Sequence, residues 1–412
     1  MSPSPYEIVL ASSPDGPIIA YDASSGAVLT HFSDSRSPRR GLALAGKTFI
    51  AASHISPTTG SGSIHLYNWW SSTAFHNLPV PEPVAPLAAT SDGSFLFGGG
   101  LSGCVYALSL PSGDVLRSFP AHRKSVSCLS ISDDGSLLIS GSDDGSVVVV
   151  PIFQLVGSSE NDQKVEDLIL HKFTAHSDSV TAIVSGTSFC NSQIISCSLD
   201  CTCKFWSLLR GTHLRTIVFQ CTILGIVLDT TESELYAAGS DGSVYKIGIS
   251  KRPASRGHEV IAWQQKHGGS VVSLAMVNEG RNLASASEDG RVWVWEVDGG
   301  KVVMELGIAM AASISDLVVA TGISYGKEHG ATGSKGSEDW RNGLCGEELV
   351  GYAVKETMEM EDVLSVGEKD RSRAIDLLES AIGMYEKLLE LILKEAKRGT
   401  GSSSREKERE NL

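Results

Sequence analysis

The chain has 412 residues, of which 42% are hydrophobic, and it carries a net charge of −14 at pH 7. This length and composition predict a globular protein with a large core, and the negative charge disfavours long-range attraction to nucleic acid. The N-terminal residues contain no basic region followed by an apolar run, and no stretch of about 18 apolar residues occurs, so we expect a soluble, unsecreted protein with no membrane partner.

A hairpin pattern recurs seven times along the chain. Each copy consists of an apolar strand, a tight turn that uses Asp or Gly, and a second, alternating strand. The turns are separated by 46, 41, 42, 56, 41 and 48 residues, which is the period of a four-stranded propeller blade. The turn positions are Gly16, Gly62, Gly103, Gly145, Cys201, Gly242 and Gly290. We therefore predict an all-β fold, a seven-bladed β-propeller over residues 1–321.

The first and last copies differ from the others in a way that predicts ring closure. The chain begins on an inner hairpin, YEIVLASS followed by PIIAYDA, whereas the last copy is followed by KVVMELG and SISDLVVA, which lack a hairpin of their own. We expect the two ends to complete one blade. Such closure removes free sheet edges, the usual liability of a β-protein.

Four residue types recur at fixed places in two of the copies. The sets are His176, Ser196, Asp200 and Trp206, and His267, Ser285, Asp289 and Trp295; a third copy has His122, Ser140 and Asp144, with Val150 in place of Trp. This pattern resembles the WD-repeat family over roughly residues 5–321. The resemblance implies that each set forms a buried hydrogen-bonded tetrad that ties the strands of its blade together. In such a set Trp supplies one N–H donor, Ser relays, and Asp orients His.

Three cysteines lie in the segment SCSLDCTCKFW, residues 196–206. Aligned with two other copies, Cys197 takes the place of Gly or Ala, Cys201 that of Gly, and Cys203 that of Val. C-x3-C-x-C is not a usual zinc spacing, and free Cys behaves as a small core hydrophobe. We therefore predict structural thiols rather than a metal or redox site. Eight cysteines in the whole chain are too sparse for a disulfide scaffold and favour a reducing compartment.

Two patterns resemble enzyme sites. The first is G-x-G-x-x-G at Gly98 to Gly103, but a strand follows it rather than the helix that would hold a pyrophosphate. The second is the triad-like set around His176, which recurs around His267 and is therefore more readily explained as a core element. We predict no catalytic residues, no cofactor and no metal, and hence a protein that is not an enzyme.

Two insertions stand out from the repeats. An acidic segment, VGSSENDQKVEDL, begins at Val156, and a small basic loop, SRSPRR, begins at Ser35. Propeller function sits on such loops because the blades supply a rigid frame. Each segment is either a contact surface or a solvated loop.

The C-terminal part of the chain departs from the repeat pattern. Residues 322–367 are rich in Gly, Ser and charge and predict a flexible linker, whose apolar residues between 340 and 354 either dock on a partner or fold back on the propeller. Residues 368–398 predict a coiled-coil helix, and residues 399–412 a disordered tail. The apolar stripe of the helix consists of Ile375, Leu378, Ile382, Tyr385, Leu389 and Ile392. We expect self-association or a partner helix to cover it, the alternative being packing on the propeller.

A closer resemblance covers most of the chain. The runs SPRRGLALAGKTFIAAS from Ser37 and SLDCTCKFWSLLRGTHLRTIVFQCTILGIVLDTTESELYAAGSDGSVYKI from Ser198 are similar to the WD-repeat subunit of the Rix complex, whose plant members include the ROOT INITIATION DEFECTIVE proteins. This resemblance implies a non-catalytic scaffold that is located in the nucleus, either in the nucleolus or in the nucleoplasm. It would act in pre-60S assembly and pre-rRNA spacer processing. The implied partners are an α-solenoid Rix-type subunit, a further complex subunit, an AAA ATPase and the pre-60S particle. The net charge favours indirect rRNA contact.

Two alternatives remain at this point. One is a WD-repeat adaptor in chromatin or replication licensing, and the other is a substrate receptor of a ubiquitin ligase. The ligase receptors resemble one another in a Trp-Asp-x-Arg/Lys box. Here Trp206 is followed by Ser-Leu-Leu and Trp295 by Glu-Val-Asp, so the box is absent.

Overall fold

The computed structural model describes residues 6–322, apart from 34, 57–58, 70, 158–167, 187–192, 209, 250–259 and 307–311. The chain divides into two compact units, residues 1–326 and 327–412. The predicted coiled-coil helix and disordered tail, and all of the predicted linker except its first residue, therefore lie outside the described residues.

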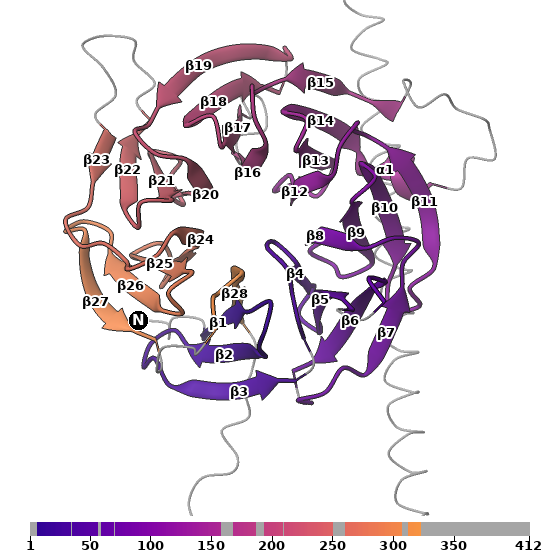
Figure 1. Ribbon diagram of the computed structural model, residues 1–412, viewed down its shortest axis with the longest axis horizontal. Helices are drawn as coiled ribbons and strands as arrows, with labels where there is room; N and C mark the ends of the chain where they lie inside the picture. Colours follow the sequence, from indigo (N-terminus) through magenta and orange to yellow (C-terminus); the bar gives the residue numbers. More distant parts are fainter. Residues whose placement is uncertain are drawn as a thin grey trace, which may run out of the picture. The chain divides into compact units, whose positions relative to one another are not determined.

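The described strands form seven four-stranded antiparallel sheets around a common centre, which confirms the all-β seven-bladed propeller (Figure 1). We number the blades in chain order, from the innermost strand outwards. Blade 1 contains β4 (Leu42–Ala45), β5 (Phe49–Ile55), β6 (Gly62–Asn68) and β7 (His76–Pro79). Blade 2 contains β8 (Val84–Ala89), β9 (Phe95–Gly100), β10 (Cys104–Ser109) and β11 (Val115–Pro120). Blade 3 contains β12 (Val126–Ile131), β13 (Leu137–Ser142), β14 (Ser146–Pro151) and β15 (His171–Thr174).

The next three blades repeat this order of consecutive strands. Blade 4 contains β16 (Val180–Ser185), β17 (Gln193–Ser198), β18 (Thr202–Ser207) and β19 (Thr212–Val218). Blade 5 contains β20 (Ile223–Leu228), β21 (Glu234–Gly239), β22 (Val244–Gly248) and β23 (Val260–Ala262). Blade 6 contains β24 (Val271–Val277), β25 (Asn282–Ser287), β26 (Val292–Glu296) and β27 (Lys301–Glu305).

Blade 7 is built from both ends of the propeller. Its strands are β28 (Asp316–Thr321), β1 (Glu7–Ser12), β2 (Ile18–Asp22) and β3 (Val28–Phe32), in that order. β28 pairs with β1 along its whole length, from Glu7 opposite Thr321 to Ser12 opposite Asp316. The ring is thus closed by hydrogen bonds between segments about as far apart in the sequence as the described chain allows (Figure 1).

Burial differs between the inner and outer strands. The second strand of a blade is covered on both faces, so that five of the six residues of β13 are buried, and its sequence is continuously apolar or small. The outermost strand faces solvent on one side, and in β11 only Phe119 is buried. Side chains of neighbouring blades form shared cores; Val9 of blade 7, for example, belongs to one cluster with Val272 and Ala284 of blade 6.

The turn between the second and third strands explains the repeated glycine. Gly145 has φ of +77°, a left-handed conformation that glycine adopts readily. A Cβ atom there would also collide with the carbonyl oxygen of His176 at the start of the next blade. In blade 4 Cys201 takes the corresponding place with φ of +62°.

The described residues include one α-helix, α1 (Ile152–Val156), which follows β14. Its buried residues, Ile152 and Leu155, pack in one cluster with Phe119 and Leu138, while Phe153 is exposed. The acidic insertion, of which residues 158–167 lie outside the described part, follows this helix.

Candidate functional site

Blade 4 brings together all four members of its predicted tetrad. Ser196 lies on β17, Trp206 on β18, Asp200 in the turn between them, and His176 in the loop that enters the blade. The indole Nε1 of Trp206 donates to Ser196 Oγ over 3.0 Å, and His176 Nε2 lies 2.9 Å from the same oxygen. His176 Nδ1 lies 2.9 Å from Asp200 Oδ2. The chain of contacts therefore joins the entering loop, the turn and both central strands.

Blade 6 contains the second set with one longer contact. Trp295 Nε1 donates to Ser285 Oγ over 2.7 Å, and His267 Nε2 lies 2.7 Å from that oxygen. His267 Nδ1 is 3.7 Å from Asp289 Oδ2, which instead accepts the backbone N–H of Gly268 at 2.8 Å. The carboxylate therefore fixes the backbone beside the histidine and contacts the imidazole only as a near neighbour.

Blade 3 shows how the incomplete third set is satisfied. His122 Nε2 lies 2.8 Å from Ser140 Oγ, as in the other two blades. Its Nδ1 lies 2.8 Å from Ser146 Oγ, and that hydroxyl donates in turn to Asp144. Ser146 thus relays between His122 and Asp144, whose closest contact is 3.8 Å. Sequence reasoning missed Ser146, although a polar residue two positions after the Asp was visible in this blade and, as Thr202, in blade 4.

Two blades without a His–Ser pair use a tyrosine and an acid instead. In blade 2 the Tyr106 hydroxyl donates to Glu82 at 2.7 Å, and Ser102 Oγ donates to Glu82 at 2.6 Å. In blade 5 the Tyr245 hydroxyl donates to Asp241 at 3.1 Å. The two tyrosines occupy the same place on β10 and β22. Sequence reasoning missed these contacts as well, because Glu82 lies in an entering loop whose length differs between blades.

Burial sets the protonation of the three histidines. Loss of water lowers the pKa of His122 and of His267 to about 4, even though a nearby Asp acts in the opposite direction in each case. Burial also lowers the pKa of His176, against the opposing effect of Asp200. All three imidazoles are therefore neutral at pH 7.

The tetrads are inaccessible to a substrate. Ser196 and Ser285 are fully buried, and each hydroxyl already lies within hydrogen-bonding distance of a Trp N–H and a His nitrogen. A hydrolase nucleophile needs an open path to its substrate. The glycine-rich run from Gly98 to Gly103 is likewise a strand and a turn followed by strand β10, with no helix behind it. The geometry of both patterns is thus that of a structural core.

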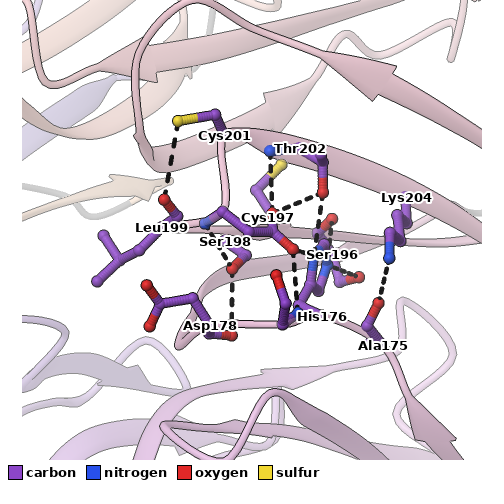
Figure 2. Close-up of polar contacts among 12 residues, drawn as sticks. Ala175, His176, Asp178, Ser196, Cys197, Ser198, Leu199, Cys201, Thr202 and Lys204 are labelled. Carbon is purple, nitrogen blue, oxygen red and sulfur yellow. Dashed lines mark hydrogen bonds and ion pairs between the residues drawn. The ribbon is translucent and has the colours of Figure 1, made fainter.

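The cysteine prediction was wrong for two of the three residues. Cys197 and Cys203 face each other across β17 and β18, with Cα atoms 4.2 Å apart, and are joined by a disulfide bond. They are therefore not free thiols. The pairing was not predicted, because each cysteine was compared only with its counterparts in other blades, and that comparison does not show that the two positions face each other in the hairpin. Cys201 lies in the turn, and its Sγ points to the carbonyl oxygen of Leu199, 3.8 Å away (Figure 2).

The basic loop from Ser35 to Arg40 is tied down over several blades. The backbone N–H of Ser37 donates to Ser13 in blade 7, and Ser315 Oγ donates to the carbonyl of Ser37 at 2.7 Å. Arg39 forms an ion pair with Glu288 of blade 6, and Arg40 donates to the carbonyl of Leu224 in blade 5 at 2.8 Å. The loop therefore acts as a strap beside the closing blade, with Arg36 exposed.

Other site classes find no counterpart in the described part of the chain. It contains no group of three His, Cys, Asp or Glu side chains that could hold a metal ion. The single helix found there is too short to cross a membrane. The residues predicted to mediate association through the C-terminal helix lie outside the described residues. They are Ile375, Leu378, Ile382, Tyr385, Leu389 and Ile392.

The seven closed blades and the repeated His–Ser–Trp contacts define a WD-repeat β-propeller. The family model "WD domain, G-beta repeat" matches residues 113–150, 168–207 and 259–296. These three segments contain the histidines and serines of blades 3, 4 and 6. The fold is also that of a computationally designed protein, Ika8, with a TM-score of 0.56, 20% identity and coverage of 77% of this chain and 90% of that chain.

Similarity to natural proteins extends over most of the propeller. The chain is 38% identical over 290 residues to Protein ROOT INITIATION DEFECTIVE 3 of Arabidopsis thaliana, which covers 70% of this chain and 66% of that relative. It is 25% identical to the pre-rRNA-processing protein IPI3 of Yarrowia lipolytica, over 69% of this chain and 68% of that protein. The chain therefore contains WD repeats and is similar to ROOT INITIATION DEFECTIVE 3 over about two thirds of that relative's length.

Proposed function

We propose that the protein is a non-catalytic scaffold subunit of a nuclear Rix-type complex that acts in pre-60S assembly and pre-rRNA spacer processing. The observation that carries this proposal is the similarity to IPI3, a protein named for pre-rRNA processing, over 69% of the chain. The inaccessibility of the tetrads supports a scaffold, because the polar sets that resemble a hydrolase hold together the strands of single blades.

The propeller provides several separate surfaces for partners. Its entering loops and turns lie on rigid blades. One of these loops, the strap from Ser35 to Arg40, is itself held by contacts with three blades. The proposed partners are an α-solenoid subunit, a further complex subunit, an AAA ATPase and the pre-60S particle. Self-association through the C-terminal helix would double the number of binding surfaces.

Contact with rRNA is proposed to be indirect. A net charge of −14 repels the phosphate backbone at long range. Most nucleic-acid binding is driven instead by Lys and Arg side chains that neutralise phosphates and release their counterions. Ultraviolet cross-linking of the complex should therefore label RNA on its other subunits. Strong labelling of this chain would contradict indirect contact while leaving the place in the pathway intact.

The pathway itself is tested by purifying the tagged full chain from nuclear extract and identifying proteins and RNA in the same eluate. We expect large-subunit ribosomal proteins together with rRNA that retains its spacer. A tagged, unrelated propeller of similar charge is the control for nonspecific recovery. An eluate of chromatin or ubiquitin-ligase components without pre-rRNA would overturn the proposed function and leave the fold unaffected.

A further inference from the structure

The disulfide in blade 4 occupies a register position that other blades fill without a covalent bond. Cys197 faces Cys203 across the central strands, and both side chains are fully buried. The corresponding facing pairs are Gly141 and Val147 in blade 3, Ala238 and Val244 in blade 5, and Ala286 and Val292 in blade 6. In each case a small residue opposes a valine, and the hairpin forms with noncovalent contacts alone.

Two reduced cysteines would fill this position in the same manner. A thiol is close in size to the small and β-branched side chains found there, and buried Cys packs as a small hydrophobe. The hairpin is also held independently of the sulfur atoms, because Trp206 donates to Ser196 and His176 contacts Asp200 in the same blade. The blade can therefore adopt one fold in both oxidation states.

We propose that Cys197 and Cys203 form a reversible redox latch that joins β17 to β18. Closing the latch is a two-electron oxidation: both thiols lose a proton, one S–S bond forms, and a low-molecular-weight disulfide accepts the electrons and becomes two thiols. Opening reverses this exchange. A small thiolate attacks one sulfur, the other leaves as a thiolate and takes a proton, and a second small thiol resolves the mixed disulfide.

The burial of the pair makes this exchange depend on opening of the hairpin. Neither sulfur of the latch is exposed, so a thiolate can attack only after β17 and β18 separate locally. The hydrogen bond from Trp206 to Ser196 spans these two strands and opposes that separation. The tetrad of blade 4 therefore controls how fast the latch responds to its surroundings.

The bond is tested in the full-length protein equilibrated with oxidised glutathione or with dithiothreitol, then denatured and alkylated. Asp200 lies between the two cysteines, so a protease that cleaves before Asp separates them, and the latch is detected as a linked peptide pair. We expect this pair after oxidation, its loss after reduction, and its persistence in Cys201→Ser. Equal alkylation of both cysteines in the two samples would overturn the proposal.

The thermal stability of the two oxidation states provides a second test. We expect the oxidised protein to melt roughly 2–5 °C above the reduced one, because the cross-link restricts the unfolded chain. The double variant Cys197→Ala, Cys203→Val reproduces the facing pair of blade 6 and should fold with one Tm under both conditions. Failure of this variant to fold would show that the fold requires the two cysteines. Equal Tm values for the two wild-type samples would show that the bond adds no stability. Either result would contradict the proposal.

The gating role of the tetrad has its own measurement. Trp206→Phe removes the bridging N–H and should speed reduction of the folded, oxidised protein by dithiothreitol roughly tenfold. Trp295→Phe makes the same change in blade 6 and should leave the rate unaltered. Equal rates for the wild type and Trp206→Phe would show that opening of this hairpin does not limit the exchange.

Discussion

Trp206 and Trp295 each donate a hydrogen bond to a fully buried serine while burying a large ring between blades. We expect Trp206→Ala and Trp295→Ala to lower the free energy of unfolding by about 3–5 kcal/mol, because each removes a buried aromatic side chain. The Phe variants keep most of the apolar contact and should cost about 1–2 kcal/mol. Chemical denaturation measures both, and unchanged stability in the Ala variants would refute the structural role of the tetrads.

The buried histidines make stability depend on pH. His122 and His267 have pKa values near 4 in the folded protein, whereas an unfolded histidine titrates near 6.5. As the pH falls from about 6.5 to 4, the unfolded chain takes up protons that the folded chain does not, so stability is lost. Each histidine contributes up to about 3 kcal/mol to this loss.

The pH effect is checked by denaturation at pH 7, 5.5 and 4.5. His122→Gln should show a smaller pH slope than the wild type, because one of the depressed groups is gone. Asp144, whose pKa falls to about 2 because hydrogen bonds from Ser146 and Arg123 outweigh burial, titrates below this window. A slope unchanged by the substitution would contradict neutral burial of His122.

At the scale of elements, the closing blade depends on a strand from each end of the propeller. Deleting residues 1–12 removes β1, which pairs with both β28 and β2, and should abolish cooperative unfolding of the propeller. Deleting residues 323–412 leaves every described strand in place, and we expect the Tm to be unchanged. A chain without residues 1–12 that still melted cooperatively at the original temperature would contradict closure by β1.

The predicted C-terminal helix carries a separate test. Replacing Ile382 and Leu389 with Asp places charges on the apolar stripe, so we expect helix-mediated association to be lost while the propeller Tm is retained. Light scattering reports the mass and calorimetry reports the Tm. Exchanging two residues of the polar tail, Glu408 and Glu410, for Asp is the matched control. An unchanged mass together with unchanged partner recovery would eliminate the stripe as the association surface.

The fold was predictable because one hairpin recurs with a regular spacing and a blade has few ways to bury it. The pairing of blade 7 followed from the unmatched strands at the two ends. The contacts of Ser146 and Glu82 were not predictable, because the same place in the blade is filled by different chemistry from copy to copy. The disulfide was missed for a different reason: its two residues were each aligned with other blades but not with each other.

At the scale of the whole molecule, the propeller is a closed frame whose tetrads are buried, and the full chain has a net charge of −14. Such a frame offers loops on several blades as possible contact surfaces, and its negative charge gives no long-range attraction to rRNA. Our proposal, which rests on the similarity to IPI3, is that this frame acts in assembly of the large ribosomal subunit.

Depletion of the protein followed by pulse-labelling of rRNA tests this proposed role. We expect precursors of the large-subunit rRNA that retain their spacer to accumulate, while the small-subunit rRNA matures normally. Re-expression of the full chain should restore processing, and re-expression of the chain lacking residues 1–12 should not. Normal maturation of the large-subunit rRNA in depleted cells would overturn the proposed function.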